Sequence, residues 1–217
     1  GRVMDLARRR VINFAQFDTL VLDEVDRMLD MGFVADIKSI VSQITQKHQT
    51  LFFSATVDQK IEVLIDSFLK NPVKVSVKTA STSSHVEQNI IRVERYRKEE
   101  TLCNLLKKPE FKKVLIFAST KMYTEKLYLS LQEKGFKVGA IHGDKRQSQR
   151  LSTIRAFKND SLNILVATDV AARGLDIHNI THVINYDQPA TYDDYIHRIG
   201  RTGRADQKGY ALTFIEP

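Results

Sequence analysis

The chain has 217 residues, enough for one large domain or two small ones, and its hydrophobic content of 42% supports a packed core. Charged residues make up 27%, no apolar stretch approaches the length of a membrane span, and the N-terminus lacks a signal-peptide pattern. A single cysteine, Cys103, excludes an intrachain disulfide and a cysteine-rich zinc site. We therefore expect a soluble, cytoplasmic protein that does not bind membranes. Cys103 lies in an amphipathic helical pattern, so we expect its side chain to fill part of the protein core.

The net charge of the chain is +7, which favours polyanionic partners such as nucleic acid. Tryptophan is absent, and no aromatic motif for stacking RNA bases is present. Phosphates and sugars are therefore the expected targets, rather than base edges.

The first part of the chain alternates short apolar runs with helical patterns, which predicts parallel α/β architecture. The expected elements are a strand at Thr19–Leu22, a helix at Val34–Gln46, a strand at Gln49–Phe53, a helix at Gln59–Phe68 and a strand at Val73–Val77. Three strands are too few for a covered parallel sheet. We therefore expect that the chain starts partway through a domain whose larger upstream part is missing.

A Ser/Thr-rich stretch, "KTASTSSH" at Lys78–His85, predicts an interdomain linker, with an ordinary surface loop as the alternative. Six further strands interleaved with helices predict a doubly wound sheet. The expected strands lie at Glu87–Val93, Val114–Phe117, Val138–Ile141, Ile164–Ala167, His182–Asn185 and Tyr210–Phe214. The expected helices lie at Lys98–Lys107, Thr124–Lys134, Gln147–Lys158 and Tyr192–Ile199. This gives a partial domain at 1–78, a linker at 79–85 and a complete domain at 86–217.

The run "TLVLDEVD" ends an expected strand in adjacent acids, Asp23 and Glu24. Ligands of open parallel sheets bind at such carboxyl ends, and Mg²⁺ favours one or two carboxylates together with waters and phosphates. Asp23 suits a Walker-B-type role, and Glu24 suits orientation or deprotonation of an attacking water. Alternatively, the acids form a solvated cluster in which Asp26 caps the following helix.

Arginines recur at three-residue spacing in "YIHRIGRTGR", at Arg198, Arg201 and Arg204. Guanidinium groups bind phosphate bidentately, so two of them in a glycine-containing loop suit a clamp on a transferring phosphoryl group. A solvated basic turn or an RNA-backbone patch is the alternative. His197, in the same motif, is a candidate to bridge toward the acids.

Two further strand ends carry candidate binding residues. In "ATDVAARGLDI", a strand ends at Thr168-Asp169, and Gly174 permits close backbone approach; a left-handed turn between charged residues is the alternative. In "AIHGDKRQSQR", Gly143-Asp144 precede a helix whose N-terminus suits phosphate, with Arg150 on its first turn.

The remaining histidines lack metal-site spacing, so we expect surface or loop positions for His48, His85, His178 and His182.

The motifs "DEVD", "SAT", "TDVAARGLDI" and "HRIGRTGR", in this order and spacing, strongly resemble those of the DEAD-box ATP-dependent RNA helicases. The resemblance covers essentially the whole chain, and the opening Gly1-Arg2 looks like the end of that family's TPGR motif. It implies two RecA-like domains on a flexible linker, the first lacking its N-terminal part. It also implies ATP hydrolysis, with Mg²⁺, coupled to local RNA unwinding or RNP remodelling, with sequence-independent contacts to the RNA backbone and unidentified protein cofactors.

The resemblance also implies roles for individual residues. Asp23 and Glu24 would hold Mg²⁺ and position water, and Asp26 would link to Ser54, Thr56 and His197 to couple the ATP state to domain closure. Arg201 and Arg204 would reach the γ-phosphate, while Gly174 and Asp176 would contact the nucleotide. The RNA backbone would be bound by Arg2, Gly143, Asp144, Arg150, Thr168 and Asp169.

The sequence departs from the family pattern in several places. Val25 replaces the usual alanine, and no proline follows "SAT". No G-x-x-x-x-G-K-S/T motif occurs, and the adenine-reading glutamine motif is missing as well. We therefore expect this chain alone to be inactive as an ATPase. The alternatives are an ATP-independent RNA-binding or partner-docking module and a DNA-directed relative.

Overall fold

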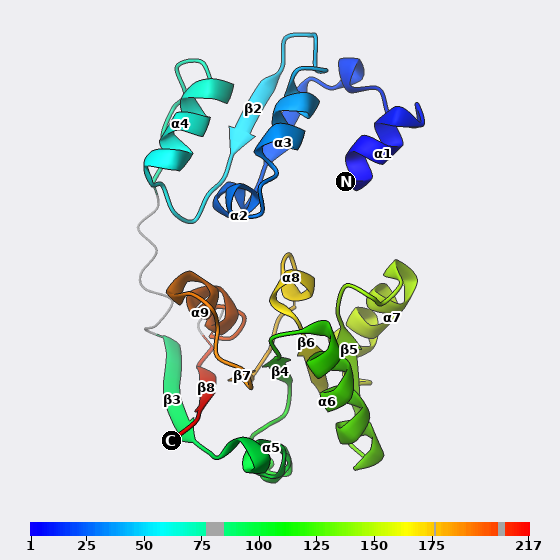
Figure 1. The fold of residues 1–217 in the computed structure, drawn as a ribbon, viewed down its shortest axis with the longest axis vertical. Helices are drawn as coiled ribbons and strands as arrows, with labels where there is room; N and C mark the ends of the chain where they lie inside the picture. The colour runs from blue at the N-terminus through cyan, green and yellow to red at the C-terminus, as the bar shows by residue number, and fades with distance from the viewer. Residues whose placement is uncertain (77–84, 176, 204–206) are drawn as a thin grey trace. The chain divides into compact units, whose positions relative to one another are not determined.

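The computed structural model describes residues 1–76, 85–175, 177–203 and 207–217. It divides into two compact units, Gly1–Val77 and Lys78–Pro217 (Figure 1). Residues 79–84 of the expected linker lie outside the described residues, as do Asp176 and Arg204. No helix in the described ranges is long and apolar enough to cross a membrane.

The first unit is a small α/β layer built on two parallel strands. Its elements are α1 (Arg2–Arg8), a 3-10 turn (Phe14–Gln16), β1 (Thr19–Leu22), α2 (Val25–Asp30), α3 (Val34–Val41), β2 (Gln49–Phe52) and α4 (Gln59–Phe68). The two strands pair in register from Thr19↔Gln49 to Leu22↔Phe52. Their core consists of Leu22, Val25, Ile37 and Leu64.

The strand expected at 73–77 is wrong for the described residues 73–76, which are irregular. Val73 and Val75 are 90% and 83% exposed, because no described strand lies beside them to bury an apolar face. The helix expected to reach Gln46 ends at Val41, and α1 and α2 were not predicted from the sequence.

The second unit contains a six-stranded sheet. Its strands are β3 (Val86–Arg92), β4 (Val114–Phe117), β5 (Val138–Ile141), β6 (Ile164–Ala167), β7 (His182–Asn185) and β8 (Gly209–Ile215). Its helices are α5 (Lys98–Leu106), α6 (Lys121–Glu133), α7 (Gln147–Lys158), α8 (Asp169–Ala172) and α9 (Tyr192–Ile199), with a 3-10 turn at Arg95–Arg97. The order is β3-β8-β7-β4-β6-β5 and every pairing is parallel. The expected doubly wound α/β architecture is confirmed; α8 is the helix that the sequence pattern did not predict.

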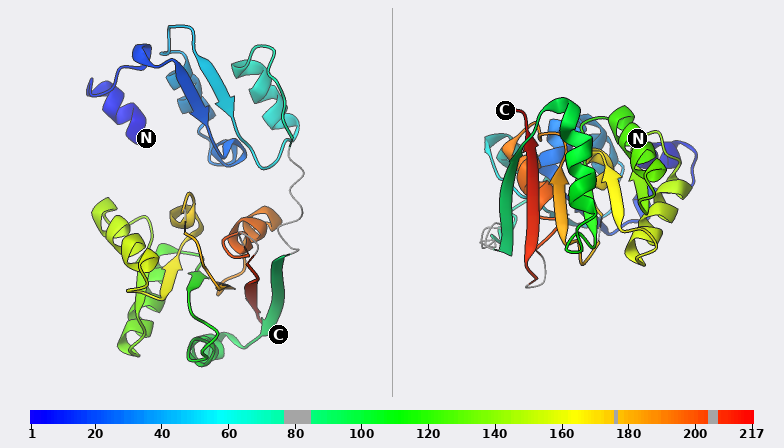
Figure 2. Two further views of the ribbon diagram at one scale, coloured as in Figure 1. Left: turned by 180° about the vertical axis from the view of Figure 1, so that it is seen from behind. Right: turned by 90° about the horizontal axis from the view of Figure 1, so that it is seen from below.

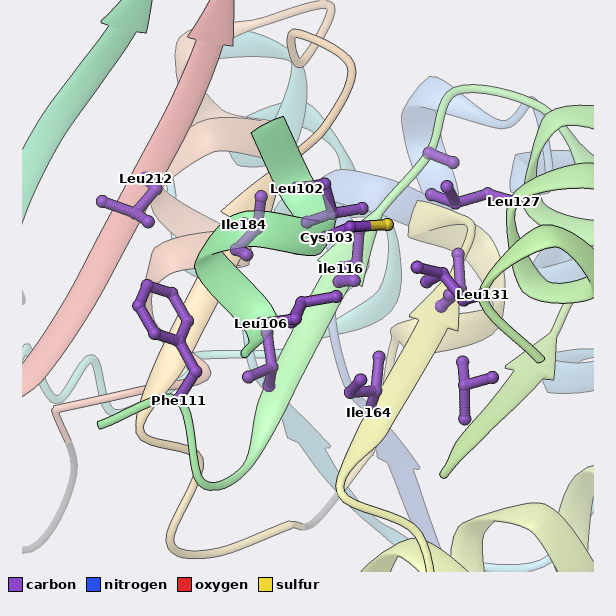
Figure 3. Packing of buried hydrophobic residues seen from close by; sticks show 14 of the residues in the cluster. Leu102, Cys103, Leu106, Phe111, Ile116, Leu127, Leu131, Ile164, Ile184 and Leu212 are labelled. Atoms are coloured by element: carbon purple, nitrogen blue, oxygen red, sulfur yellow. The ribbon is translucent and has the colours of Figure 1, made fainter. Parts of the chain in front are cut away.

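The helices cover both faces of this sheet. Connections from β3 to β5 run one way along the sheet and those from β5 to β8 run back, so right-handed crossovers place α5 and α6 opposite α7, α8 and α9. Figure 2, right, looks onto the α5/α6 face. The core there packs Leu102 and Leu106 of α5 and Leu131 of α6 onto strand residues such as Ile116 (Figure 3).

Cys103 lies in this core, as expected, and burial raises the pKa of its thiol. His182, by contrast, was expected at the surface but is buried in β7. Its ring stacks between Phe111, at a centroid distance of 4.0 Å, and Tyr210, at 5.0 Å. Its Nδ1 lies 2.9 Å from Thr181 Oγ1. The lack of metal-site spacing did not predict exposure of His182, because an imidazole ring with one polar partner can pack in a core as an aromatic side chain does.

Burial of His182 predicts a pH dependence of stability. Burial lowers the pKa of His182 below its usual 6.5, so the unfolded chain binds the proton more readily than the folded one. The free energy of unfolding should therefore fall as the pH drops through about 6.5. We expect His182→Phe to lose this part of the dependence in urea unfolding at pH 7.5 and 5.5. His48→Phe is the control, and an unchanged slope in His182→Phe would contradict the prediction.

Candidate functional site

The first unit presents two carboxylates at the carboxyl end of β1. Asp23 is exposed, and its Oδ1 accepts a hydrogen bond from the Glu24 N–H at 2.9 Å. Glu24 is the N-cap of α2 and has a left-handed backbone, with φ of 52°. Val25, only 1% exposed, donates its N–H to Phe53 O at 3.2 Å. This anchored turn stores strain of roughly 1–3 kcal/mol and holds both acids at the sheet edge.

Asp26 connects the acidic turn to the segment after β2. Its Oδ2 accepts hydrogen bonds from the Ala55 and Thr56 N–H groups, each at 3.1 Å, and from Thr56 Oγ1 at 3.3 Å. Ser54 Oγ donates to Thr56 O at 2.6 Å instead of reaching Asp26. The alternative of Asp26 as a helix cap is wrong, because Glu24 holds the N-cap position and Asp26 lies in the first turn.

In the second unit, Arg198 is buried rather than displayed for a ligand. Its side chain forks onto Asp169, with Nε–Oδ1 and Nη2–Oδ2 distances of 2.6 and 2.7 Å. Nη1 donates to Asn185 Oδ1 at 3.2 Å and to Asp187 O at 2.7 Å. The guanidinium carbon lies 5.0 Å from the Phe117 ring centroid. This network ties α8, α9 and the ends of β4 and β7 together.

The Arg198 network gives Asp169 and Asn185 structural roles that the sequence pattern did not predict. Asp169 was expected at an RNA-backbone contact, yet its two carboxylate oxygens face Arg198. Asn185 was missed, although a lone amide closing the apolar strand "HVIN" signals a buried polar contact.

The segment after α9 is held close to the sheet, which positions Arg201. Thr202, 1% exposed, donates from Oγ1 to Ile180 O at 2.5 Å. Gly203 has φ of 67°, and a Cβ there would lie 2.6 Å from Val86 Cγ2. Arg201 Nη1 donates to Leu175 O at 3.0 Å, next to Gly174. The structure thus brings two of the expected nucleotide-binding residues, Arg201 and Gly174, together.

A second loop at the same sheet edge follows β5. His142 is buried, and its Nε2 lies 2.8 Å from Glu125 Oε2, while Lys145 Nζ lies 2.8 Å from Glu125 Oε1. Burial acts to raise the pKa of Glu125, but hydrogen bonds from Lys145 and His142 outweigh it and hold that pKa below its usual value. Beyond His142, Gly143 is exposed, and no atom lies within 4 Å of a Cβ built on it.

Thr168 joins this loop to the arginine network. Its N–H donates to Ile141 O at 3.3 Å, so the ends of β5 and β6 are adjacent. Asp144 pairs with Lys121 at 3.0 Å, and Arg150 Nη1 lies 3.4 Å from Gln147 Oε1 on α7. The expected residues Gly143, Asp144 and Thr168 therefore share one edge of the second unit. Arg2, in the first unit, is exposed on α1 and pairs with Asp5 at 3.5 Å.

The charge of the chain is divided unequally. Residues 1–77 carry ten Lys/Arg and ten Asp/Glu, whereas residues 78–217 carry 23 and 16, so the net charge of +7 belongs to the second unit. Among the described residues, no group of three or more His, Cys, Asp or Glu side chains is placed to hold a metal ion. Asp23 and Glu24 instead suit a cation that takes most of its ligands from water and phosphate.

Removal of one partner from the Arg198–Asp169 pair should destabilise the second unit. Arg198→Leu removes the buried partner of the partly exposed Asp169 carboxylate, which costs at most about 3–5 kcal/mol. The double variant with Asp169→Leu should cost less than the sum of the single changes. Urea unfolding followed by circular dichroism measures both, and Arg155→Leu on exposed α7 is the control. Additive losses would show that the pair is not coupled.

Comparison with known proteins matches both units. The family described as "DEAD/DEAH box helicase" matches residues 1–64, and the "Helicase conserved C-terminal domain" matches residues 97–206. The DEAD-box ATP-dependent RNA helicase CshA of Bacillus subtilis is 43% identical over 218 residues, covering 100% of this chain and 44% of that protein. The ATP-dependent RNA helicase vasa of Drosophila melanogaster is 46% identical over 220 residues, covering 100% of this chain and 33% of that protein. The chain thus spans less than half the length of these relatives.

Solved structures give the same match. A DEAD box protein from Methanococcus jannaschii aligns with a TM-score of 0.59 at 39% identity, covering 99% of this chain and 58% of that one. S. cerevisiae Dbp5 bound to RNA and ADP BeF3 aligns with a TM-score of 0.84 at 29% identity, covering 99% and 57%.

Proposed function

Because the chain belongs to the DEAD-box RNA helicase family and has its RecA-like fold, we propose that the whole protein couples ATP hydrolysis to local RNA unwinding or RNP remodelling. The observation that carries this proposal is the acidic turn, where Asp23 and Glu24 stand at a strand end and Asp26 ties them to the segment after β2. We divide the chain into the C-terminal part of the first RecA-like domain at 1–78, a linker at 79–85 and the second domain at 86–217. Its single buried thiol, Cys103, suits the reducing cytoplasm.

We assign the nucleotide contacts as follows. ATP with Mg²⁺ supplies the phosphoryl group that is transferred to water. Asp23 and Glu24 would hold the ion and orient the water, while Gly174 and Asp176 would contact the nucleotide. Arg201 and Arg204 supply positive charge to the γ-phosphate, and the Arg201–Leu175 O contact holds the first of them near Gly174.

Asp26, Ser54, Thr56 and His197 form the proposed coupling group. The Asp26–Thr56 hydrogen bonds tie the acidic turn to the segment after β2, which supports this proposal. A change at Glu24 is therefore transmitted to Thr56 without any new contact. His197, partly buried on α9, is the proposed partner from the second unit.

RNA is the proposed polyanion, bound through its backbone by Arg2, Gly143, Asp144, Arg150 and Thr168. The relative Dbp5 was solved with RNA, and the excess positive charge of the second unit fits such a ligand. A carboxylate facing Arg198 repels phosphate, so we propose that Asp169 positions α8 and that its neighbour Thr168 meets the RNA.

The 217-residue chain should show no appreciable ATPase activity. Its sequence has no P-loop lysine and no amide cradle for the β- and γ-phosphates. Phosphate release measured with and without RNA checks this. RNA-stimulated turnover that Glu24→Gln abolishes would contradict the prediction.

Binding of single-stranded RNA should be salt-dependent and independent of sequence. Arg150→Ala should weaken binding and reduce the magnitude of the slope of log K against log salt by about 0.7, the value for one phosphate contact on a single strand. Fluorescence anisotropy between 50 and 200 mM salt, about a fourfold range, measures both. Arg155→Ala, on the same helix, is the matched control. Equal effects of the two changes would show that Arg150 does not contact the RNA backbone.

A second candidate is an ATP-independent module that binds RNA or docks a partner. It is favoured by the net charge of the second unit together with the missing P-loop. RNA affinity of this chain that is unchanged by ATP or ADP supports the module for this chain. The relative Dbp5 has also been solved with Gle1 and IP6, and we propose a protein cofactor for this protein too, without assigning its identity.

A further inference from the structure

A cavity of about 500 Å³ lies at the carboxyl edge of the second sheet, between the N-terminal turns of α5 and α6. Three tyrosines and three cations line it: Tyr96, Tyr123, Tyr186, Arg95, Lys98 and Lys126. This volume falls within the range of small-ligand sites, about 300–1,000 Å³. We call it the tyrosine cavity; none of the residue roles proposed above involves it.

Two of the three rings of the tyrosine cavity are available to a ligand. The side chains of Tyr96 and Tyr123 are 82% and 47% exposed, so their rings are not packed into the core. Burial raises the pKa of Tyr186 to about 12, so its hydroxyl remains a hydrogen-bond donor at neutral pH.

Two of the three acids that line the tyrosine cavity, Asp187 and Glu99, already have partners. Asp187 accepts from the Ser119 N–H at 2.8 Å and lies 3.8 Å from Lys98 Nζ. Glu99 is held by Lys134 and by Ser130 Oγ. Within the described residues, no acid lies within ion-pair distance of Arg95 or Lys126. The third acid, Glu216, is exposed, so Arg95 and Lys126 together leave an excess of one positive charge for a ligand.

The tyrosine cavity lies across the first turn of α6 from Gly143 and Asp144, which are proposed to bind the RNA backbone. Lys121 and Glu125 project from α6 toward Asp144 and His142, whereas Tyr123 and Lys126 project into the cavity. A helix is about 10–12 Å wide with its side chains, so a strand bound at Asp144 reaches the cavity by crossing this single turn.

We propose that the tyrosine cavity receives one unstacked base of the single-stranded RNA bound along Gly143 and Thr168, with the base against Tyr123 and its phosphate near Lys126. This inference rests on the proposed RNA binding and extends it from the backbone to a base. Aromatic faces accept any base, so the contact adds affinity without sequence preference. A peptide would leave the paired arrangement of rings and cations unexplained, whereas a nucleotide offers both a ring and a phosphate.

The test compares two RNA strands that differ only in their bases. Anisotropy titrations of the 217-residue chain use a uridine 12-mer and an abasic strand with the same ribose-phosphate backbone. The native chain should bind the uridine strand roughly five- to 150-fold more tightly, the effect of one stacked base. Tyr123→Ala should abolish that difference and leave affinity for the abasic strand unchanged. Tyr123→Phe should retain it.

The controls separate this inference from the proposed function. Arg150→Ala should weaken both strands equally, and Tyr192→Ala, an exposed tyrosine on α9, should change neither. If both strands bind equally well, or if Tyr123→Ala weakens them equally, the base site is overturned while RNA binding stands. Binding of neither strand overturns both. Displacement of the uridine strand from the native chain by free UMP, but not from Tyr123→Ala, would reassign the cavity to a free nucleotide.

Discussion

The buried guanidinium of Arg198 is the interaction on which the working edge of the second unit depends. It makes a charge-assisted fork with Asp169 and two further hydrogen bonds to Asn185 and Asp187, so four of its five N–H donors bond to protein groups. Desolvating a guanidinium is expensive, and these hydrogen bonds offset that cost. The pair joins α8 to α9, next to Thr168 and three residues before Arg201.

The first unit uses the same device in a weaker form. Asp26 gathers two backbone N–H groups and one hydroxyl, and thereby fixes the segment after β2 against α2. In each unit, one charged side chain makes internal contacts within a few residues of a charged side chain with a proposed ligand role. Asp26 and Glu24 form one such set, and Arg198 and Arg201 form the other. This arrangement explains why motifs of adjacent charged residues contain both positioning and reacting groups.

Local patterns predicted the elements of the second unit closely, because parallel buried strands such as Val114–Phe117 and Ile164–Ala167 are continuous apolar runs between helical periods. The same logic failed at Val73–Val77, where an apolar run has no strand beside it in the described residues. It failed again at His182, because the packing that stacks its ring comes from Phe111 and Tyr210, distant in sequence.

The sequence by itself determined the family, the alternation of strands and helices along the chain, and the carboxylates and arginines near strand ends. All three depend on residue type and spacing alone. Only the tertiary structure decided how those charges are used. Arg198 and Arg201 are equivalent in the repeat "RIGR", yet the first is buried against the Asp169 carboxylate and the second donates to a backbone carbonyl. Spacing cannot distinguish them, because burial and partner are set by elements that meet only when the sheet is assembled.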